Sequence, residues 1–207
     1  LILIRRAFFF GARMITLDQL RAIMPYAGKR AEVFIDPLNR AMDEFKIDTP
    51  ARAAAFLAQL AHESGCLRYL HELATGAAYD DREDLGNTRP EAIRIAAEHG
   101  STPGRWWRGE GPMQITGFDN MMACSIALYG EPDYLLHHPQ TLELPLPGSR
   151  SAGWFWKTHN LNKWADAGDF DGVSDVINRG RKTEKDGDAN GYADRLAYFE
   201  RAQRVLA

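Results

Sequence analysis

Apolar residues recur at intervals of three and four over most of this chain of 207 residues, which is the spacing of helices that bury one face. The clearest example covers residues 50–63, where Thr49 is a good N-cap and Pro50 takes the first helical position, at which its missing N–H costs nothing. The pattern therefore predicts a mainly α-helical protein. Further helices are expected at 17–25, 29–46, 91–98, from about 119, around 154–156, at 170–180 and at 193–206.

The apolar pattern of the helix at 50–63 stops at a polar motif, His-Glu-Ser-Gly, at residues 62–65. In one unbroken helix Glu63 and Glu72 would lie on opposite faces, about 900° apart in rotation and about 13 Å apart along the axis. Because Gly65 weakens the helix, we expect a break near 64–66 that lets both carboxyl groups face one site.

Two facing carboxylic acids are what the hydrolysis of a glycosidic bond requires. One must be protonated to give a proton to the leaving oxygen, and the other must be ionised to activate water, at a separation of about 6.5–9.5 Å. Burial against apolar groups favours the neutral acid, so Glu63 is the better acid and Glu72, beside a polar stretch, is the better base. The alternative is that both are ordinary surface glutamates.

A second candidate is the segment 109–120, GEGPMQITGFDN. Its glycines allow the backbone to approach a ligand closely, while Gln114, Thr116 and Asn120 offer donors and acceptors. The segment could bind a sugar, or hold the attacking water through the Thr116 hydroxyl. A tight turn that leads into a helix is the alternative.

Residues 74–112 are rich in Gly, Pro, Asp and Asn, and a long irregular stretch in a compact domain is usually functional or disordered. Trp106 and Trp107 argue against disorder, and we expect one of them, Trp107 by preference, to stack on a sugar ring. The aromatic residues at 154–156 have helical spacing and are expected in the core.

Composition narrows the classes of function. The formal net charge of −3 argues against a nucleic-acid binder that relies on phosphate contacts. Cys66 and Cys124 fit no zinc pattern and form no disulfide framework, so two buried free thiols are expected, with a single bridge left open.

Residues 1–13 differ from the rest of the chain. Their apolar run is split by two arginines, is too short to span a bilayer, and lacks the order of a signal peptide. We interpret them as a non-native or translated upstream segment, with a membrane-targeting segment as the alternative. Residues 14–207 are then expected to form a single catalytic domain.

Several motifs follow one another in a fixed order from Met14 onwards, and several motifs in order are more specific than any one. Together they resemble the family 19 glycoside hydrolases, the chitinase-like group, and within it the endolysins of bacteriophages and prophages. The motifs are LDQLRAIMP, PLNRAMDEFKIDTPARAAAFLAQLAHESG, AYDDREDLGNT, GPMQITG, SAGWFWKTHNLN, DVINRG and ADRLAYFERAQRVL.

The resemblance implies a mainly α, lysozyme-like, two-lobed helical domain with a substrate cleft. It implies inverting hydrolysis of β-1,4 bonds in polymers of N-acetylglucosamine or N-acetylmuramic acid, with no metal and no cofactor. By position, Glu63 corresponds to the general acid, Glu72 to the general base and Thr116 to the residue that positions water. The residues expected to contact substrate are Gln114, Asn120, Asn178, Trp107, Tyr79 and His62.

The sequence departs from the family pattern at five positions. Glu110 replaces an arginine, which reverses a charge expected beside the cleft, and Asp80 lies where the endolysins commonly have a glutamate, so it is the alternative base. Cys66 and Arg179 replace glycines, and Met121 replaces an aromatic residue. None of these changes removes a proposed catalytic group.

The leading hypothesis is an endolysin that cuts the glycan chain of peptidoglycan. It is expected to be a monomer, with no nucleic-acid partner and no stable membrane insertion. It would be made in the host bacterial cytoplasm, without a signal peptide, and act in the cell wall once a separate protein has opened the membrane. A chitinase and an inactive sugar-binding protein are the two alternatives.

Overall fold

The structure, a computed structural model, describes residues 14–207, so the interpretation of residues 1–13 lies outside the described residues. The regular structure of the described chain is helical, apart from isolated β-bridges that join His71 to Glu110 and Glu110 to Ile115, and the predicted fold class is confirmed. The α-helices are α1 Leu17–Ile23, α2 Arg30–Glu44, α3 Pro50–Glu63, α4 Pro90–Glu98, α5 Pro103–Trp106, α6 Phe118–Tyr129, α7 Tyr134–His137, α8 Pro145–Thr158, α9 Leu161–Asp166, α10 Phe170–Arg179 and α11 Tyr192–Leu206. Three short 3-10 helices complete the elements: η1 Ala77–Tyr79, η2 Glu83–Leu85 and η3 Pro139–Glu143.

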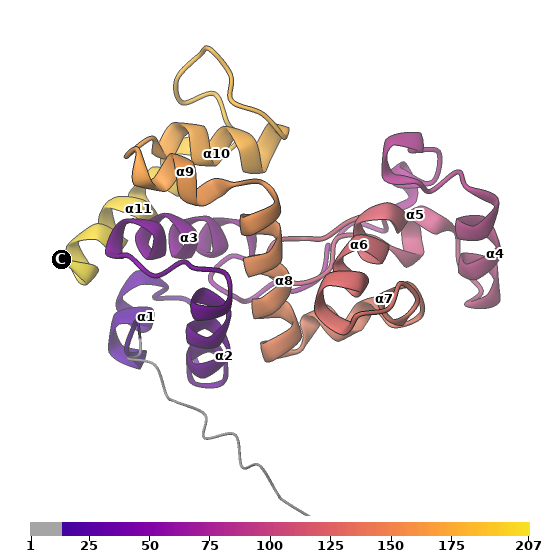
Figure 1. The fold of residues 1–207 in the computed structure, drawn as a ribbon, viewed down its shortest axis with the longest axis horizontal. Helices are drawn as coiled ribbons and strands as arrows, with labels where there is room; N and C mark the ends of the chain where they lie inside the picture. Colours follow the sequence, from indigo (N-terminus) through magenta and orange to yellow (C-terminus); the bar gives the residue numbers. More distant parts are fainter. Residues whose placement is uncertain (1–13) are drawn as a thin grey trace, which may run out of the picture.

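The helices gather into two groups, which Figure 1 shows side by side along the longest axis. The larger group holds α1 to α3 and α9 to α11, with α3 packed on α11. The smaller group holds α4 to α7, and α8 stands between the two groups and packs on α2. None of the helices within residues 14–207 is long and apolar enough to cross a membrane.

Helix α3 is the centre of the larger group. The Thr49 side chain accepts a hydrogen bond from the Arg52 N–H at 3.2 Å, and Pro50 takes the first position, as predicted. Every residue from Ala53 to Ala61 is buried, and the ring of Phe56 meets the ring of Trp156 edge-on at 5.4 Å. This burial fixes where the end of α3 lies, and with it the position of Glu63.

The expected break after Glu63 is confirmed. Helix α3 ends at Glu63 with Ser64 as its C-cap, and the next three residues, Gly65, Cys66 and Leu67, have φ angles of 54°, 61° and 64°. Ser64 stabilises the turn, because its hydroxyl donates to the Leu60 carbonyl at 2.6 Å and accepts from the Leu67 N–H at 2.7 Å. Left-handed conformations at Cys66 and Leu67 cost free energy for residues with a Cβ, so burial must hold this turn in place.

Both cysteines are buried and free, which confirms the expectation of two thiols. The aromatic segment 154–156 lies in α8, where Trp156 is fully buried and its two neighbours pack against the core.

Candidate active site

Glu63, at the C-terminal end of α3, forms an ion pair with a buried arginine. Its Oε1 lies 2.6 Å from Nη1 of Arg195 on α11, and only 2% of the Arg195 side chain is exposed, against 22% for Glu63. The guanidinium also donates to the Gln59 side chain and, through Nε at 3.0 Å, to the Asn190 carbonyl. Arg195 therefore joins the end of α3 to the segment that leads into α11.

Arg195 was missed by the sequence analysis, although the chain holds a signal for it. The residues at 192, 195, 196 and 199 share one face of α11, and three of these four are hydrophobic residues that pack against the core. A charged residue on an apolar face is rarely buried without a partner, so Arg195 points to a carboxylate inside the protein.

Glu72 lies on an extended segment that pairs with the glycine-rich segment 109–111. Its N–H donates to the Gly109 carbonyl at 2.8 Å, and the Gly109 N–H donates back to Oε2 at 3.2 Å. The Tyr79 hydroxyl donates to Oε1 at 3.0 Å. Both oxygens of Glu72 thus accept a hydrogen bond, so its carboxyl group is held in one orientation.

Tyr79 was expected to contact substrate, and the structure places its hydroxyl on Glu72 instead. Burial, and then the hydrogen bond to Glu72, raise the pKa of Tyr79 above its ordinary value of 10.0. Tyr79 therefore remains a donor over the whole neutral range and holds the Glu72 carboxylate in place. Its predicted contact with a sugar stays a prediction.

The turn at 64–67 sends the chain away from the axis of α3. The Leu70 carbonyl accepts from the Gly111 N–H at 2.7 Å, so residues 70–72 run beside 109–111 rather than extending the helix. An unbroken helix would have placed Glu63 and Glu72 on opposite faces, and the turn avoids that placement. The expected carboxyl separation of about 6.5–9.5 Å stays a prediction.

The segment 109–120 closes on itself through its polar side chains. The Gln114 amide donates to the Gly111 carbonyl at 2.9 Å, the Thr116 hydroxyl donates to the Gln114 carbonyl at 2.9 Å, and the Asn120 amide donates to the Thr116 carbonyl at 2.8 Å. A Cβ at Gly109 would lie 2.6 Å from Oε1 of Gln114, so a side chain there would displace the Gln114 amide. The segment is a tight turn into α6, and the Thr116 oxygen keeps its acceptor capacity for a water.

His62 contacts the first turn of α11, and Asn178 contacts the segment that precedes it. Nδ1 of His62 lies 2.7 Å from Oδ2 of Asp194, and the Asn178 side-chain oxygen accepts from the Asn190 N–H at 2.9 Å. A Cβ at Gly191 would lie 2.3 Å from Cε1 of His62, so the backbone passes directly against this ring. Sugar contacts by His62 and Asn178 stay predictions.

Comparison with known proteins identifies the fold. No family model matches the chain. An endochitinase of Arabidopsis thaliana is 32% identical over 113 residues, which are 53% of this chain and 32% of that protein, so the chain matches only about a third of the relative's length.

Solved structures match over nearly the whole chain. Chitinase C from Streptomyces griseus superposes with a TM-score of 0.71 at 21% identity, over 95% of this chain and 78% of that one. A bacterial family 19 chitinase gives 0.68 at 21% identity over 94% and 95%. A family 19, class IV chitinase from Zea mays gives 0.66 at 19% identity over 94% and 94%.

This chain has the family 19 chitinase fold. The likeness confirms the lysozyme-like helical architecture that the sequence predicts. Within residues 14–207, no group of three or more His, Cys, Asp or Glu side chains is arranged to hold a metal ion.

In this family 19 chitinase fold, Trp107 belongs to the core. Its side chain is fully buried, its ring meets Phe118 edge-on at 5.1 Å, and its Nε1 donates to the Leu136 carbonyl at 3.1 Å. A ring with no exposed face cannot stack on a sugar, so the predicted substrate contact is wrong. Trp106 is partly exposed but stacks on His99 at 4.0 Å, which occupies one face of its ring.

Asp80, the alternative base, is already engaged elsewhere. Its Oδ1 accepts a hydrogen bond from the Gly104 N–H at 2.8 Å, where α5 packs on η1. This contact gives Asp80 a structural role in the smaller group of helices, and the choice between Glu72 and Asp80 as the base stays a prediction.

Glu110 does not lie beside an open cleft as expected, because its side chain is buried. Only 2% of the residue is exposed, Oε2 has no hydrogen-bond partner in the described chain, and the nearest cation, Nε of Arg108, is 3.8 Å from Oε1. Burial, reinforced by Glu143 and opposed by Arg108, raises the pKa of Glu110 to about 8. At neutral pH the side chain of Glu110 is therefore protonated, so a glutamate at this position adds no negative charge.

Glu110→Gln is expected to change how stability depends on pH. Unfolded Glu110 ionises near 4.5 and folded Glu110 near 8, so the folded chain holds one extra proton between these values. The free energy of unfolding of the wild type therefore falls as the pH rises through this window, by at most about 5 kcal/mol. Urea titrations at pH 5 and pH 8.5 should show a smaller fall for Glu110→Gln. An equal fall in this variant and in the exposed control Glu131→Gln would contradict the assignment.

Proposed function

We propose that this chain is a glycoside hydrolase that cleaves β-1,4 bonds next to N-acetylglucosamine in a cell-wall polymer. The observation that carries the proposal is the pair of carboxyl groups, each held by its own partner, on a family 19 chitinase fold. Glu63 is held by Arg195 at 2.6 Å, and Glu72 by the Tyr79 hydroxyl at 3.0 Å and the Gly109 N–H at 3.2 Å.

In the proposed reaction, the carboxylate of Glu72 takes a proton from a water oriented by the Thr116 hydroxyl. The water oxygen attacks the anomeric carbon while Glu63 gives its proton to the departing glycosidic oxygen. The products are a new reducing end of inverted configuration and a free hydroxyl. Glu63 has then lost one proton and Glu72 has gained one. Proton exchange with solvent returns both groups to their starting states.

Arg195 holds the proposed acid in place, because its Nη1 lies 2.6 Å from Oε1 of Glu63 at the end of α3. In the proposed reaction the glycosidic oxygen must therefore reach a carboxyl group whose position the guanidinium fixes.

We favour peptidoglycan as the polymer. Two observations support it: the motifs that resemble endolysins, and a basic surface beside the turn that follows Glu63. The Arg68 guanidinium lies 5.3 Å from the ring centroid of Tyr26 and 5.4 Å from that of Tyr69, with no carboxylate partner within residues 14–207. A neighbouring hollow of about 140 Å³ is lined by Tyr26, Asp194, Ala197, Tyr198 and Arg201.

This surface offers two features that a peptidoglycan strand would use. Exposed tyrosine rings can stack on sugars, and the Arg68 guanidinium, which donates to the Gly65 carbonyl at 2.8 Å, can also bind a carboxylate of a stem peptide. Chitin is uncharged, so of these two interactions it could make only the stacking of its sugars on the tyrosine rings. Chitin is nevertheless the second candidate, because the matched relatives bear the name chitinase.

Two parallel assays with wild-type protein test the proposal. One follows the turbidity of bacterial cells stripped of their outer membrane, and the other measures soluble sugar released from chitin. Clearing of the cells supports peptidoglycan as the substrate. Release of sugar from chitin without clearing identifies the protein as a chitinase. Binding to either polymer with no release, by the folded protein, would overturn the proposal and favour a sugar-binding protein.

Arg68→Gln should separate the two substrates. We expect cell clearing to slow by up to about fivefold, because one exposed pairing of Arg68 with a peptide carboxylate is lost. Release from an uncharged chitin oligosaccharide should not change. The matched control is Arg40→Gln, an exposed arginine on α2 that makes no ion pair within residues 14–207. Equal slowing on both substrates would contradict a role in recognising charge.

A further inference from the structure

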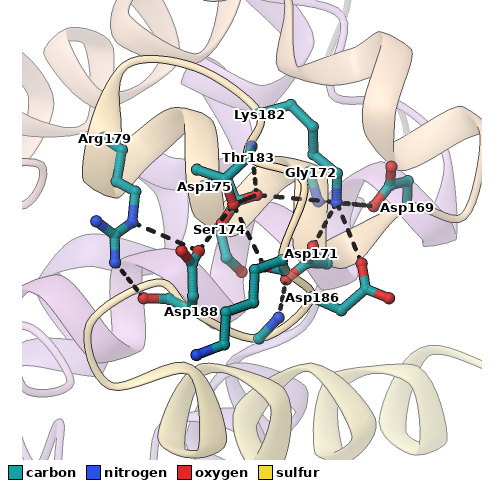
Figure 2. A network of polar contacts seen from close by, with 12 residues as sticks. Asp169, Asp171, Gly172, Ser174, Asp175, Arg179, Lys182, Thr183, Asp186 and Asp188 are labelled. Carbon is teal, nitrogen blue, oxygen red and sulfur yellow. Dashed lines mark hydrogen bonds and ion pairs between the residues drawn. The ribbon is translucent and has the colours of Figure 1, made fainter.

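Lys182, on the loop between α10 and α11, holds together a cluster of aspartates (Figure 2). The ammonium group of Lys182 forms a short contact with Asp171 and lies 3.5 Å from Asp169, 3.8 Å from Asp175 and 3.9 Å from Asp186. Three of these four carboxylates come from α10 or its N-cap, and the fourth comes from the loop itself. Lys182 is thus the cation that lets the loop approach the acidic face of α10.

Further hydrogen bonds depend on this approach. The N–H of Thr183 and its hydroxyl both donate to Oδ2 of Asp175, at 3.0 and 3.1 Å, and the Gly187 N–H donates to Oδ1 of Asp171 at 2.7 Å. The side chain of Asp175 is fully buried, and its Oδ1 has no hydrogen-bond partner in the described chain. A buried carboxylate of this kind depends on a nearby cation, so removing the lysine charge would expel the loop or force protons onto the aspartates.

The far end of the same loop contacts the proposed active site. The Asn190 N–H donates to the Asn178 side chain at 2.9 Å, and the Asn190 carbonyl accepts from Nε of Arg195 at 3.0 Å. The next residue, Gly191, lies against the ring of His62. A displaced loop would therefore remove one of the acceptors that orient the Arg195 guanidinium.

We propose that Lys182 is a positioning residue for the reaction: by locking the loop 181–191 onto α10, it fixes the Asn190 carbonyl and hence the orientation of Arg195 against Glu63. The expected effect of Lys182 on catalysis rests on the proposed function. The positional link itself, from Lys182 to Arg195, stands on the contacts of the loop.

The catalytic consequence is tested with Lys182→Met and its matched control Lys185→Met. Lys185 is exposed on the same loop, and its ammonium makes no ion pair within residues 14–207, so both variants remove one positive charge from the same segment. On a soluble oligosaccharide, we expect kcat to fall roughly ten- to a hundredfold in Lys182→Met, the scale of a misplaced catalytic group, with KM changed less than about threefold. Lys185→Met should match the wild type. Unchanged kcat in Lys182→Met, or equal loss in both variants, would overturn the proposal.

A second measurement tests the positional link from Lys182 to Arg195 without depending on the proposed function. The buried Nε–H of Arg195 should give a slowly exchanging signal in a nitrogen–proton NMR spectrum of the wild type and of Lys185→Met. In Lys182→Met we expect that signal to move and to exchange faster while the spectrum of α3 stays in place. That result supports the positional link even if the wild type degrades neither polymer. An unaltered Arg195 signal in Lys182→Met overturns the link whatever the activity.

Discussion

Glu63→Gln is expected to lower the rate of hydrolysis by about a thousandfold while leaving the fold intact. A glutamine of the same shape cannot give a proton to the departing oxygen, and general acid catalysis contributes about 10²–10⁴ in rate. The amide oxygen can still accept from Arg195, which is buried at 2% exposure, so the guanidinium keeps a partner. The loss should therefore appear in kcat, with KM close to that of the wild type.

The measurement is turnover of the better of the two polymers, together with a thermal melt. Glu200→Gln is the control, because Glu200 is exposed on α11 and makes no ion pair within residues 14–207. A Glu63→Gln variant that melts like the wild type and retains more than about a tenth of its rate would remove Glu63 from the role of acid.

Arg195→Met is expected to be the most destabilising of the single substitutions considered. It leaves the Glu63 carboxylate, the Gln59 side chain and the Asn190 carbonyl without their shared donor. Breaking one side of a buried ion pair costs about 3–5 kcal/mol. For a domain of this size that corresponds to a fall in Tm of roughly 10 °C. Activity should also be lost at temperatures where the variant is still folded.

The control for this substitution is Arg204→Met, an exposed arginine in the last turn of the same helix, which should change Tm by little. The double variant Glu63→Gln with Arg195→Met should lose less stability than the two single variants lose in sum. The reason is that no carboxylate is then left without its cation. Additive losses would show that the contact at 2.6 Å contributes nothing.

The sequence predicted well those features whose causes are local. Thr49 and Pro50 mark the start of α3, and the Ser64-Gly65 pair marks its end, because capping and glycine flexibility act within one or two turns. The Gly180 C-cap of α10, with a φ of 77°, belongs to the same class. These signals located Glu63 at a helix end, which is the central fact of the candidate site.

Features that depend on packing between distant segments were not predictable in the same way. Trp107 lies in an irregular stretch typical of a binding loop, yet the Leu136 carbonyl and the ring of Phe118 bury it. Glu110 occupies a glycine-rich segment that reads as exposed, yet its neighbours remove it from water. In both cases the deciding partner is supplied by another part of the chain, which the local pattern does not reveal.

Arg195 and the loop that Lys182 anchors show the same limit. The loop 181–191 consists mostly of polar and charged residues, and its sequence does not reveal that Lys182 pairs with aspartates on α10. Its order comes from aspartates on α10, whose carboxylates surround one ammonium (Figure 2). Glu63 and Glu72 could therefore be proposed as the catalytic pair from sequence, whereas the groups that hold their side chains required the structure.

The most direct test of the two-carboxylate mechanism is the configuration of the new reducing end. A β-1,4-linked oligosaccharide of the polymer that the protein is found to cleave would be digested in an NMR tube, and the anomeric protons followed before mutarotation. Direct attack by a water that Glu72 activates predicts the α-anomer as the first product. Early accumulation of the β-anomer would mean retention, and would contradict the roles given to Glu63 and Glu72.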